Sequence, residues 1–182
     1  KQLYPTIATP WGSLTGIRPT KLFRELTSEG GLPHAREMFL SVFGVSPEKT
    51  ALAEAICAVQ EPMIASVEET DADVYVGIPF CQTKCLYCSF PSEVLKDPAR
   101  LTPYLTALKR DIAAGALLAR ERNMRIRSFY MGGGTPTVLS AVQLEDLLSY
   151  LCEQYGSLGE ERTVEAGRPD TIDREKLETL KR

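Results

Sequence analysis

The sequence has little of what several classes of protein require. It contains one histidine and one tryptophan, its net charge is only -3, and it has no apolar run long enough to cross a bilayer. Nucleic acids and membrane surfaces favour basic partners, so this charge argues against both. The first residues carry no apolar core followed by a small-residue cleavage site, as a signal peptide would. We therefore expect a cytoplasmic protein without a nucleic-acid partner or a membrane span. Because the chain starts at Lys1 and not at a methionine, we also expect it to be a piece of a longer protein.

Three of the five cysteines stand close together, at Cys81, Cys85 and Cys88, in the pattern C-x3-C-x2-C. A secreted disulfide scaffold would be shorter, richer in cysteine and more evenly spaced. Clustered thiols therefore point to metal ligands. A structural zinc site needs four ligands, but the single histidine and the remaining cysteines, Cys57 and Cys152, fall in helical patterns. The alternative that a fourth ligand lies beyond the end of the chain stays open. Three cysteines favour an iron–sulfur cluster in which one iron has no protein ligand.

Helical patterns fill the chain to about residue 70. Helix signals begin at Pro19 and again at Pro33. The triplet Ser46-Pro47-Glu48 predicts a further helix start, and Pro62 its end. Apolar residues within that helix recur at helical spacing and predict one apolar face. They are Leu52, Ala55, Ile56 and Val59.

Strands and helices alternate after residue 70. The predicted strands cover residues 74–78, 126–131 and 163–166, and helix signals follow at Pro103, Ser140 and Asp173. This order predicts an α/β fold with a parallel sheet whose strands lie in chain order and whose helices cover one side. A closed barrel needs about eight such units. We therefore expect three βα units of a partial barrel in residues 71–182, preceded by a helical N-terminal region in residues 1–70. The cysteine loop directly follows the first strand, at the end where such folds bind ligands.

Three motifs in this order resemble one family. VYVGIPFCQTKCLYCSF, residues 74–90, resembles the signature of the radical S-adenosylmethionine (radical SAM) enzymes, and is similar in particular to the oxygen-independent coproporphyrinogen III oxidase group. FYMGGGTPT, residues 129–137, resembles that group's glycine motif, and TVEAGRPDTID, residues 163–173, its third-strand segment. WGSLTGIRPTKL, residues 11–22, resembles the coproporphyrinogen dehydrogenase-like branch, which has an extra N-terminal helical region. The similarity covers nearly the whole chain.

The resemblance implies two cofactors. A 4Fe-4S cluster would be held by Cys81, Cys85 and Cys88, and its open iron would bind S-adenosylmethionine. One electron through the cluster would cleave the sulfonium and release a 5'-deoxyadenosyl radical. The resemblance also places contacts to S-adenosylmethionine at positions of the three motifs. They are Tyr75, Tyr87, Gly133, Gly134, Thr135 and Glu165.

Simpler interpretations of these residues remain open. The glycines could only turn the chain, Tyr75 could be a core aromatic, and Glu165 could form a structural ion pair with Arg168. Cys57 and Cys152 are expected to be small apolar residues of helix cores.

For the reaction, the resemblance implies oxidative decarboxylation of coproporphyrinogen III to protoporphyrinogen IX in haem biosynthesis. Such an oxidoreductase needs a porphyrinogen substrate and an electron-donor protein. Two positions depart from members that oxidise coproporphyrinogen. Gly77 stands where they have a histidine, and Phe90 where they have a fourth cysteine. Because haem-handling members of the group show a phenylalanine there, a haem chaperone is the alternative. No catalytic residue is assigned, since substrate-specifying residues usually come from later strands.

Overall fold

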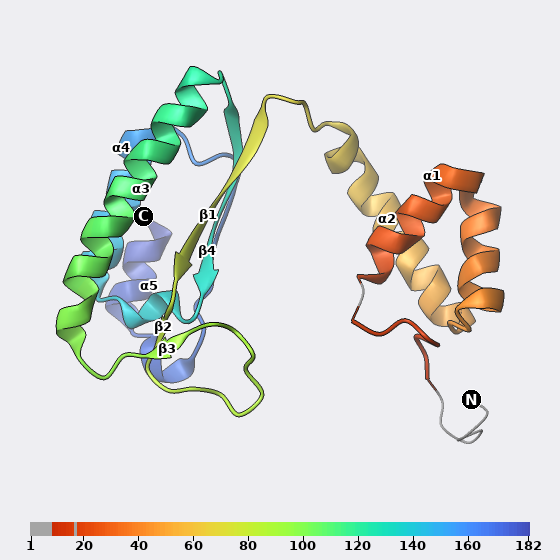
Figure 1. Cartoon of the computed structure of the whole chain (residues 1–182), viewed down its shortest axis with the longest axis horizontal. Helices are drawn as coiled ribbons and strands as arrows, with labels where there is room; N and C mark the ends of the chain where they lie inside the picture. Colours follow the sequence, from red (N-terminus) through yellow and green to blue (C-terminus); the bar gives the residue numbers. More distant parts are fainter. Residues whose placement is uncertain (1–8, 17) are drawn as a thin grey trace. The chain divides into compact units, whose positions relative to one another are not determined.

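The structure is a computed structural model that describes residues 9–16 and 18–182. The chain divides into two compact units, residues 1–67 and 68–182 (Figure 1). Within the described ranges, none of the helices combines the length and the apolarity that crossing a membrane takes.

The first unit is helical. It consists of α1 (Pro19–Glu37), the single π-helical turn η1 (Met38–Val42) and α2 (Pro47–Ala65). Gly31 interrupts α1 with a non-helical backbone (φ 81°, ψ 173°), so α1 is two helices joined at a kink just before Pro33, as the sequence predicts. A small core holds the unit together, in which the rings of Phe23 and Phe39 meet edge to face with centroids 4.9 Å apart.

The start of α2 is confirmed, and its predicted end is wrong. The Ser46 side chain accepts a hydrogen bond from the backbone N–H of Lys49 at 3.3 Å, which caps the helix. The helix does not end at Pro62 but continues to Ala65. A proline removes its own N–H donor, here the one that would reach the carbonyl of Ala58, and its ring crowds that carbonyl. That local loss is not enough to end the helix.

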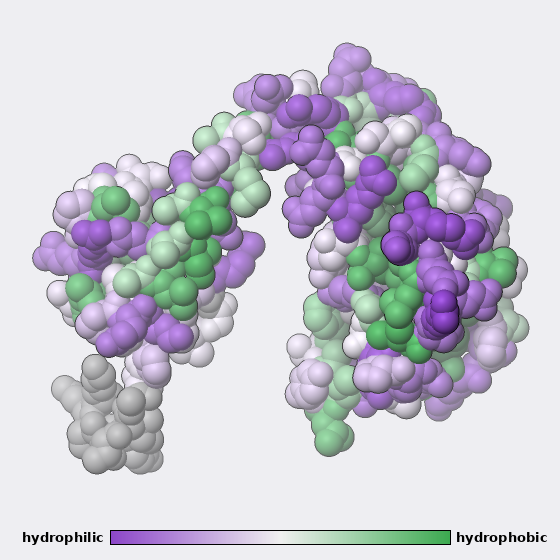
Figure 2. Space-filling model, turned by 180° about the vertical axis from the view of Figure 1, so that it is seen from behind, coloured by the Kyte–Doolittle hydropathy of each residue, from purple (hydrophilic) through white to green (hydrophobic). Residues whose placement is uncertain are grey.

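The apolar face predicted for α2 exists, but it does not face the core. The buried positions of the helix are the small residues Thr50, Ala53 and Cys57. The larger apolar residues form a band along the outside of α2, where Val59 is 72% exposed (Figure 2). The exposed large apolar residues of α2 are Leu52, Ile56, Val59, Met63 and Ile64, and Val67 follows just after the helix. Small residues occupy the buried face of α2, because they let α1 approach closely.

The second unit is an α/β layer. Its sheet has the order β1 (Asp71–Ile78), β4 (Arg125–Gly133) and β5 (Glu161–Val164), and both pairings are parallel. The helices α3 (Leu101–Glu121), α4 (Ala141–Tyr155) and α5 (Arg174–Lys181) cover one side of the sheet (Figure 1). This confirms the predicted strand order and the common side of the helices. The third strand is shifted, because it ends at Val164 and leaves Glu165 just beyond it.

Short elements connect these layers. Two strands of two residues each, β2 (Phe80–Cys81) and β3 (Glu93–Val94), pair in parallel on either side of the cysteine loop. Three 3-10 turns precede helices or follow strands. They are η2 (Pro98–Arg100), η3 (Pro136–Val138) and η4 (Pro169–Thr171).

The core of this unit lies between the sheet and the helices. Alternate residues of β1 and β4 point into it and meet the leucine face predicted for α4. The capping box predicted at the start of α4 is present, with reciprocal bonds between Ser140 and Gln143. Cys152 is exposed, so its predicted place in a helix core is wrong. The core side chains include Val76, Ile78, Phe129, Met131, Leu144, Leu147 and Leu151.

Truncating the α4 face should destabilise the second unit. Leu147→Ala removes a fully buried side chain and leaves a cavity, so the free energy of unfolding should fall by about 2–5 kcal/mol. Val142→Ala on the same helix is the control, because Val142 is 70% exposed and should change that free energy by about 0.5 kcal/mol at most. Urea unfolding followed by circular dichroism measures both. Equal losses in the two variants would mean that α4 does not bury this face.

Candidate functional site

The carboxyl ends of the three strands meet at one edge of the sheet. The β1–β4 pairing runs to Ile78 and Gly133 and then continues beyond the strands. The N–H of Gly134 donates to the carbonyl of Ile78 and that of Thr135 to the carbonyl of Phe80, each at 2.8 Å. The cysteine loop and the glycine motif therefore leave the sheet side by side, although about fifty residues separate them in the sequence.

The cysteine loop, residues 82–92, is closed at its base. Cys81 is buried in β2, and its carbonyl accepts a hydrogen bond from the N–H of Leu95 at 2.8 Å. Inside the loop, the ammonium group of Lys84 donates to the carbonyls of Phe90 and Ser92, at 3.1 and 3.2 Å. Lys84 thus ties the two arms of the loop together. Sequence reasoning missed this residue, because a lysine in a polar loop gives no local signal of an inward bond.

The three motif cysteines have free thiols: Cys81 is buried in β2 just before the loop, and Cys85 and Cys88 lie on the loop and are partly exposed. The N–H of Cys88 donates to the carbonyl of Cys85 at 3.1 Å, which forms a tight turn. In the part of the chain that the structure describes, no three metal-binding side chains are gathered at ligand distance. The loop therefore brings the thiols to one region but not into a finished site, which is common where metal binding completes the fold. The donor set itself, three unpaired thiols between Cys81 and Cys88, fits an iron–sulfur cluster.

A guanidinium group stands next to one of these thiols. Nη1 of Arg168 donates to Sγ of Cys85 at 3.4 Å, while its Nε and Nη2 bond both carboxylate oxygens of Asp170. The hydrogen bond to Asp170 is the main reason that the pKa of Arg168 is raised, and Arg168 in turn lowers the pKa of Asp170. The ion pair considered between Glu165 and Arg168 is thus replaced by one between Arg168 and Asp170.

Glu165 has a different partner on the open face of the sheet. The hydroxyl of Tyr130 donates to Oε1 of Glu165 at 2.6 Å, and this bond is the main cause of the raised pKa of Tyr130. The ring of Tyr75 stacks on that of Tyr130, with centroids 5.9 Å apart and an interplanar angle of 15°. Tyr75 is 61% exposed, so it is not a core aromatic. Sequence reasoning missed Tyr130, although strand alternation places it on the face opposite Met131.

The glycine motif meets two separate steric demands. Gly133 has a φ of +104°, which side chains rarely adopt. At Gly134 an added Cβ would lie 2.6 Å from the carbonyl oxygen of Phe80 and 3.0 Å from Sγ of Cys81. Gly134 is therefore needed for the fold around Cys81 itself, with or without a ligand. The neighbouring Thr135 is almost completely buried.

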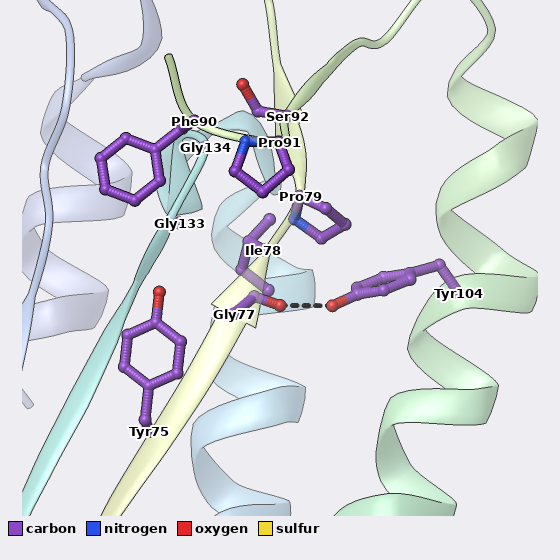
Figure 3. Close-up of a pocket in the computed structure, with 10 residues that line it drawn as sticks. All are labelled: Tyr75, Gly77, Ile78, Pro79, Phe90, Pro91, Ser92, Tyr104, Gly133 and Gly134. Atoms are coloured by element: carbon purple, nitrogen blue, oxygen red, sulfur yellow. Dashed lines mark hydrogen bonds between the residues drawn. The ribbon is translucent and has the colours of Figure 1, made fainter. Parts of the chain in front are cut away.

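A cavity of about 370 Å³ opens at the end of β1 (Figure 3). Its walls are mostly apolar and aromatic, and they come from β1, the glycine motif, the end of the cysteine loop and α3. The hydroxyl of Tyr104 crosses from α3 to bond the carbonyl of Gly77 on the unpaired edge of β1. Apolar walls with a few polar groups suit an organic ligand. The lining residues are Tyr75, Gly77, Ile78, Pro79, Phe90, Pro91, Ser92, Tyr104, Gly133 and Gly134.

Only some of the predicted cofactor residues thus lie together at the cavity. Tyr75, Gly133 and Gly134 line the cavity. Glu165 is connected to Tyr75 through Tyr130. Tyr87 is different, because it is 90% exposed on the cysteine loop and does not line the cavity.

Comparison with known proteins shows which proteins this chain resembles. Residues 75–182 match the radical SAM superfamily. The oxygen-independent coproporphyrinogen-III oxidase-like protein HemZ of Bacillus subtilis is 34% identical over 98% of this chain and 37% of its own length. The heme chaperone HemW of Lactococcus lactis is 39% identical over 54% of this chain and 24% of its own length.

A solved structure also matches. It is described as coproporphyrinogen III oxidase (HemN) from Escherichia coli, a radical SAM enzyme. The TM-score is 0.52 at 26% identity, over 67% of this chain and 28% of that one. The chain thus matches 24–37% of the length of these proteins.

Adding a methyl group at Gly134 should disturb Cys81. Gly134→Ala forces its Cβ against the backbone of Phe80, which should cost about 1–3 kcal/mol of unfolding free energy and speed alkylation of the Cys81 thiol. Gly77→Ala is the matched control, because a Cβ there meets only the Tyr75 ring, at 3.4 Å. Denaturant unfolding and mass-spectrometric mapping of alkylated Cys81 test the pair. Unchanged Cys81 alkylation in Gly134→Ala would contradict the close approach.

Proposed function

Because this chain belongs to the radical SAM superfamily, in the group of oxygen-independent coproporphyrinogen III oxidases and their relatives, we propose that it is the cluster-binding part of an enzyme that oxidatively decarboxylates coproporphyrinogen III to protoporphyrinogen IX. The family implies a 4Fe-4S cluster and S-adenosylmethionine as cofactors. The observation that carries the proposal is the meeting of the cysteine loop with the glycine motif at one edge of a parallel sheet. We propose the reducing cytoplasm, where thiols stay free, as its compartment.

In this proposal the cysteine loop holds the cluster. Cys81, Cys85 and Cys88 are its three ligands, and the buried Cys81 fixes the start of the loop to β3. When bound, the cluster and S-adenosylmethionine supply the electron transfer and the radical chemistry, and the protein supplies binding, orientation and exclusion of water. Three ligands leave one iron free for a cofactor.

The open face of the sheet then binds S-adenosylmethionine. The bond from Tyr130 occupies Oε1 of Glu165 and leaves Oε2 to accept from an ammonium or a ribose hydroxyl. The exposed face of Tyr75 can attract a sulfonium through its π electrons. Gly133 and Gly134 bring bare backbone to the cavity wall. Thr135 supports the cavity wall from behind, because it is almost completely buried and its N–H donates to the carbonyl of Phe80. Tyr87 contacts the cofactor only if the cysteine loop folds over it.

The substrate is the less direct part of the proposal. The B. subtilis protein with an oxidase-like name aligns with almost the whole chain, including the helical first unit, which supports a porphyrinogen as substrate. An electron-donor protein would reduce the cluster. The porphyrinogen itself would meet residues of the complete protein as well as of this chain.

Phe90 favours one alternative function. This residue, which stands where coproporphyrinogen-oxidising members have a cysteine, lines the same cavity as Gly77, the other departure from their pattern. The similarity to a protein named heme chaperone points the same way. A haem chaperone would keep the cluster and S-adenosylmethionine but transfer haem without converting a porphyrinogen.

The cluster assignment predicts which cysteines matter. After anaerobic reconstitution, Cys81→Ala, Cys85→Ala and Cys88→Ala should each lose the bound iron and its broad visible absorption. Cys57→Ala and Cys152→Ala are the controls and should keep both, because these residues lie on α2 and α4. Iron and sulfide analysis gives the stoichiometry. Stoichiometric zinc after anaerobic purification, with no uptake of iron, would refute the cluster.

The reaction itself is tested on the complete protein. Incubated anaerobically with coproporphyrinogen III, S-adenosylmethionine and a reductant, it should form protoporphyrinogen IX and carbon dioxide. Chromatography of the oxidised porphyrins identifies the product. Stable haem binding without any porphyrin product would support the chaperone instead.

A further inference from the structure

Arg168 is held in place by a loop that is itself firmly anchored. The Thr137 hydroxyl donates to the carbonyl of Ala166 at 2.8 Å, and the hydroxyls of Thr137 and Thr171, both almost fully buried, lie 2.7 Å apart. The ammonium group of Lys176 donates to the carbonyls of Thr137 and Thr171, both at 2.9 Å. Residues 166–171 are therefore tied to η3 and α5.

The guanidinium plane of Arg168 is fixed as well. Nε lies 3.0 Å from Oδ1 of Asp170, and Nη2 lies 3.3 Å from Oδ2, so two nitrogens share one carboxylate. This fork leaves Nη1 as the end that reaches Sγ of Cys85, 83 residues earlier in the chain. An anchored loop and a forked ion pair thus aim one N–H donor at the sulfur of a motif cysteine.

We propose that Arg168 is a positioning residue for the cluster, which keeps its bond to the Cys85 sulfur in the loaded protein and thereby raises the reduction potential of the cluster. This inference rests on the proposed function, because it needs the cluster. Reduction adds negative charge to a cluster and its thiolates. A charged donor to a ligand sulfur therefore stabilises the reduced state more than the oxidised state. The arginine would make it easier for a donor protein to deliver the electron.

The experiment compares midpoint potentials of the anaerobically reconstituted protein by redox titration with electron paramagnetic resonance detection. In Arg168→Gln, the ratio of reduced to oxidised cluster at a fixed potential should fall about tenfold, which is a shift of about 59 mV to more negative values for one electron. Arg174→Gln is the charge-matched control, since that guanidinium bonds Glu178 on its own helix at 2.7 Å. It should leave the potential unchanged.

A second variant separates the sulfur bond from a general loosening of the loop. Asp170→Asn breaks the same ion pair but keeps the guanidinium and removes a negative charge, so its potential should fall less than that of Arg168→Gln. Equal falls in Arg168→Gln and Asp170→Asn would overturn the inference, as would an unchanged potential in Arg168→Gln. If Arg168→Gln loads no iron, full loading of Asp170→Asn and Arg174→Gln supports the inference, and loss of loading in Asp170→Asn overturns it.

The two proposals fail in different ways. If the unaltered protein takes up no iron, the cluster-based function falls and the role of Arg168 falls with it. If it loads iron normally and Arg168→Gln keeps the original potential, only the role of Arg168 is lost.

Discussion

The parallel backbone ladder between β1 and β4 is the constraint on which the site depends. Because the ladder continues past both strands through the N–H groups of Gly134 and Thr135, the chain after β1 is held against the chain after β4. The approach is close enough that a single Cβ at Gly134 would collide with Phe80 and with the sulfur of Cys81. The same hydrogen bonds that build the sheet thus position the first cysteine.

The two faces of this sheet have different roles. One face carries Val76, Ile78 and Met131 into a core closed by the leucines of α4. The other face carries Tyr75, Tyr130 and, just after β5, Glu165, which are linked by ring stacking and a hydrogen bond. The packed face makes the scaffold rigid, and the polar and aromatic face remains available for a ligand. Strand alternation alone produces this division.

Two cations organise the cysteine loop. Lys84 crosses it from within and bonds two of its carbonyls, which holds the arms together. Arg168 approaches from the segment after β5 and bonds the Cys85 thiol. The loop has few apolar contacts of its own, since most of its side chains are exposed. Its shape therefore depends on such polar bonds, and among the described residues the thiols are not gathered at ligand distance.

Local sequence determined the elements and the cofactor chemistry. The Ser140 capping box predicted the start of α4 and C-x3-C-x2-C predicted the thiol loop, because each depends on neighbours a few residues away. Alternation of strands and helices predicted a parallel sheet in chain order, because right-handed crossovers restrict how such units can pair. Tertiary structure alone decided the partners of residues far apart: Tyr130 with Glu165, Arg168 with Cys85, and the outward face of Leu52 and Val59 on α2. Periodicity shows that a helix has an apolar face, but which face is buried depends on how closely its neighbour can pack. The pairing of a carboxylate or a guanidinium likewise depends on which side chains the folded sheet brings within hydrogen-bond distance.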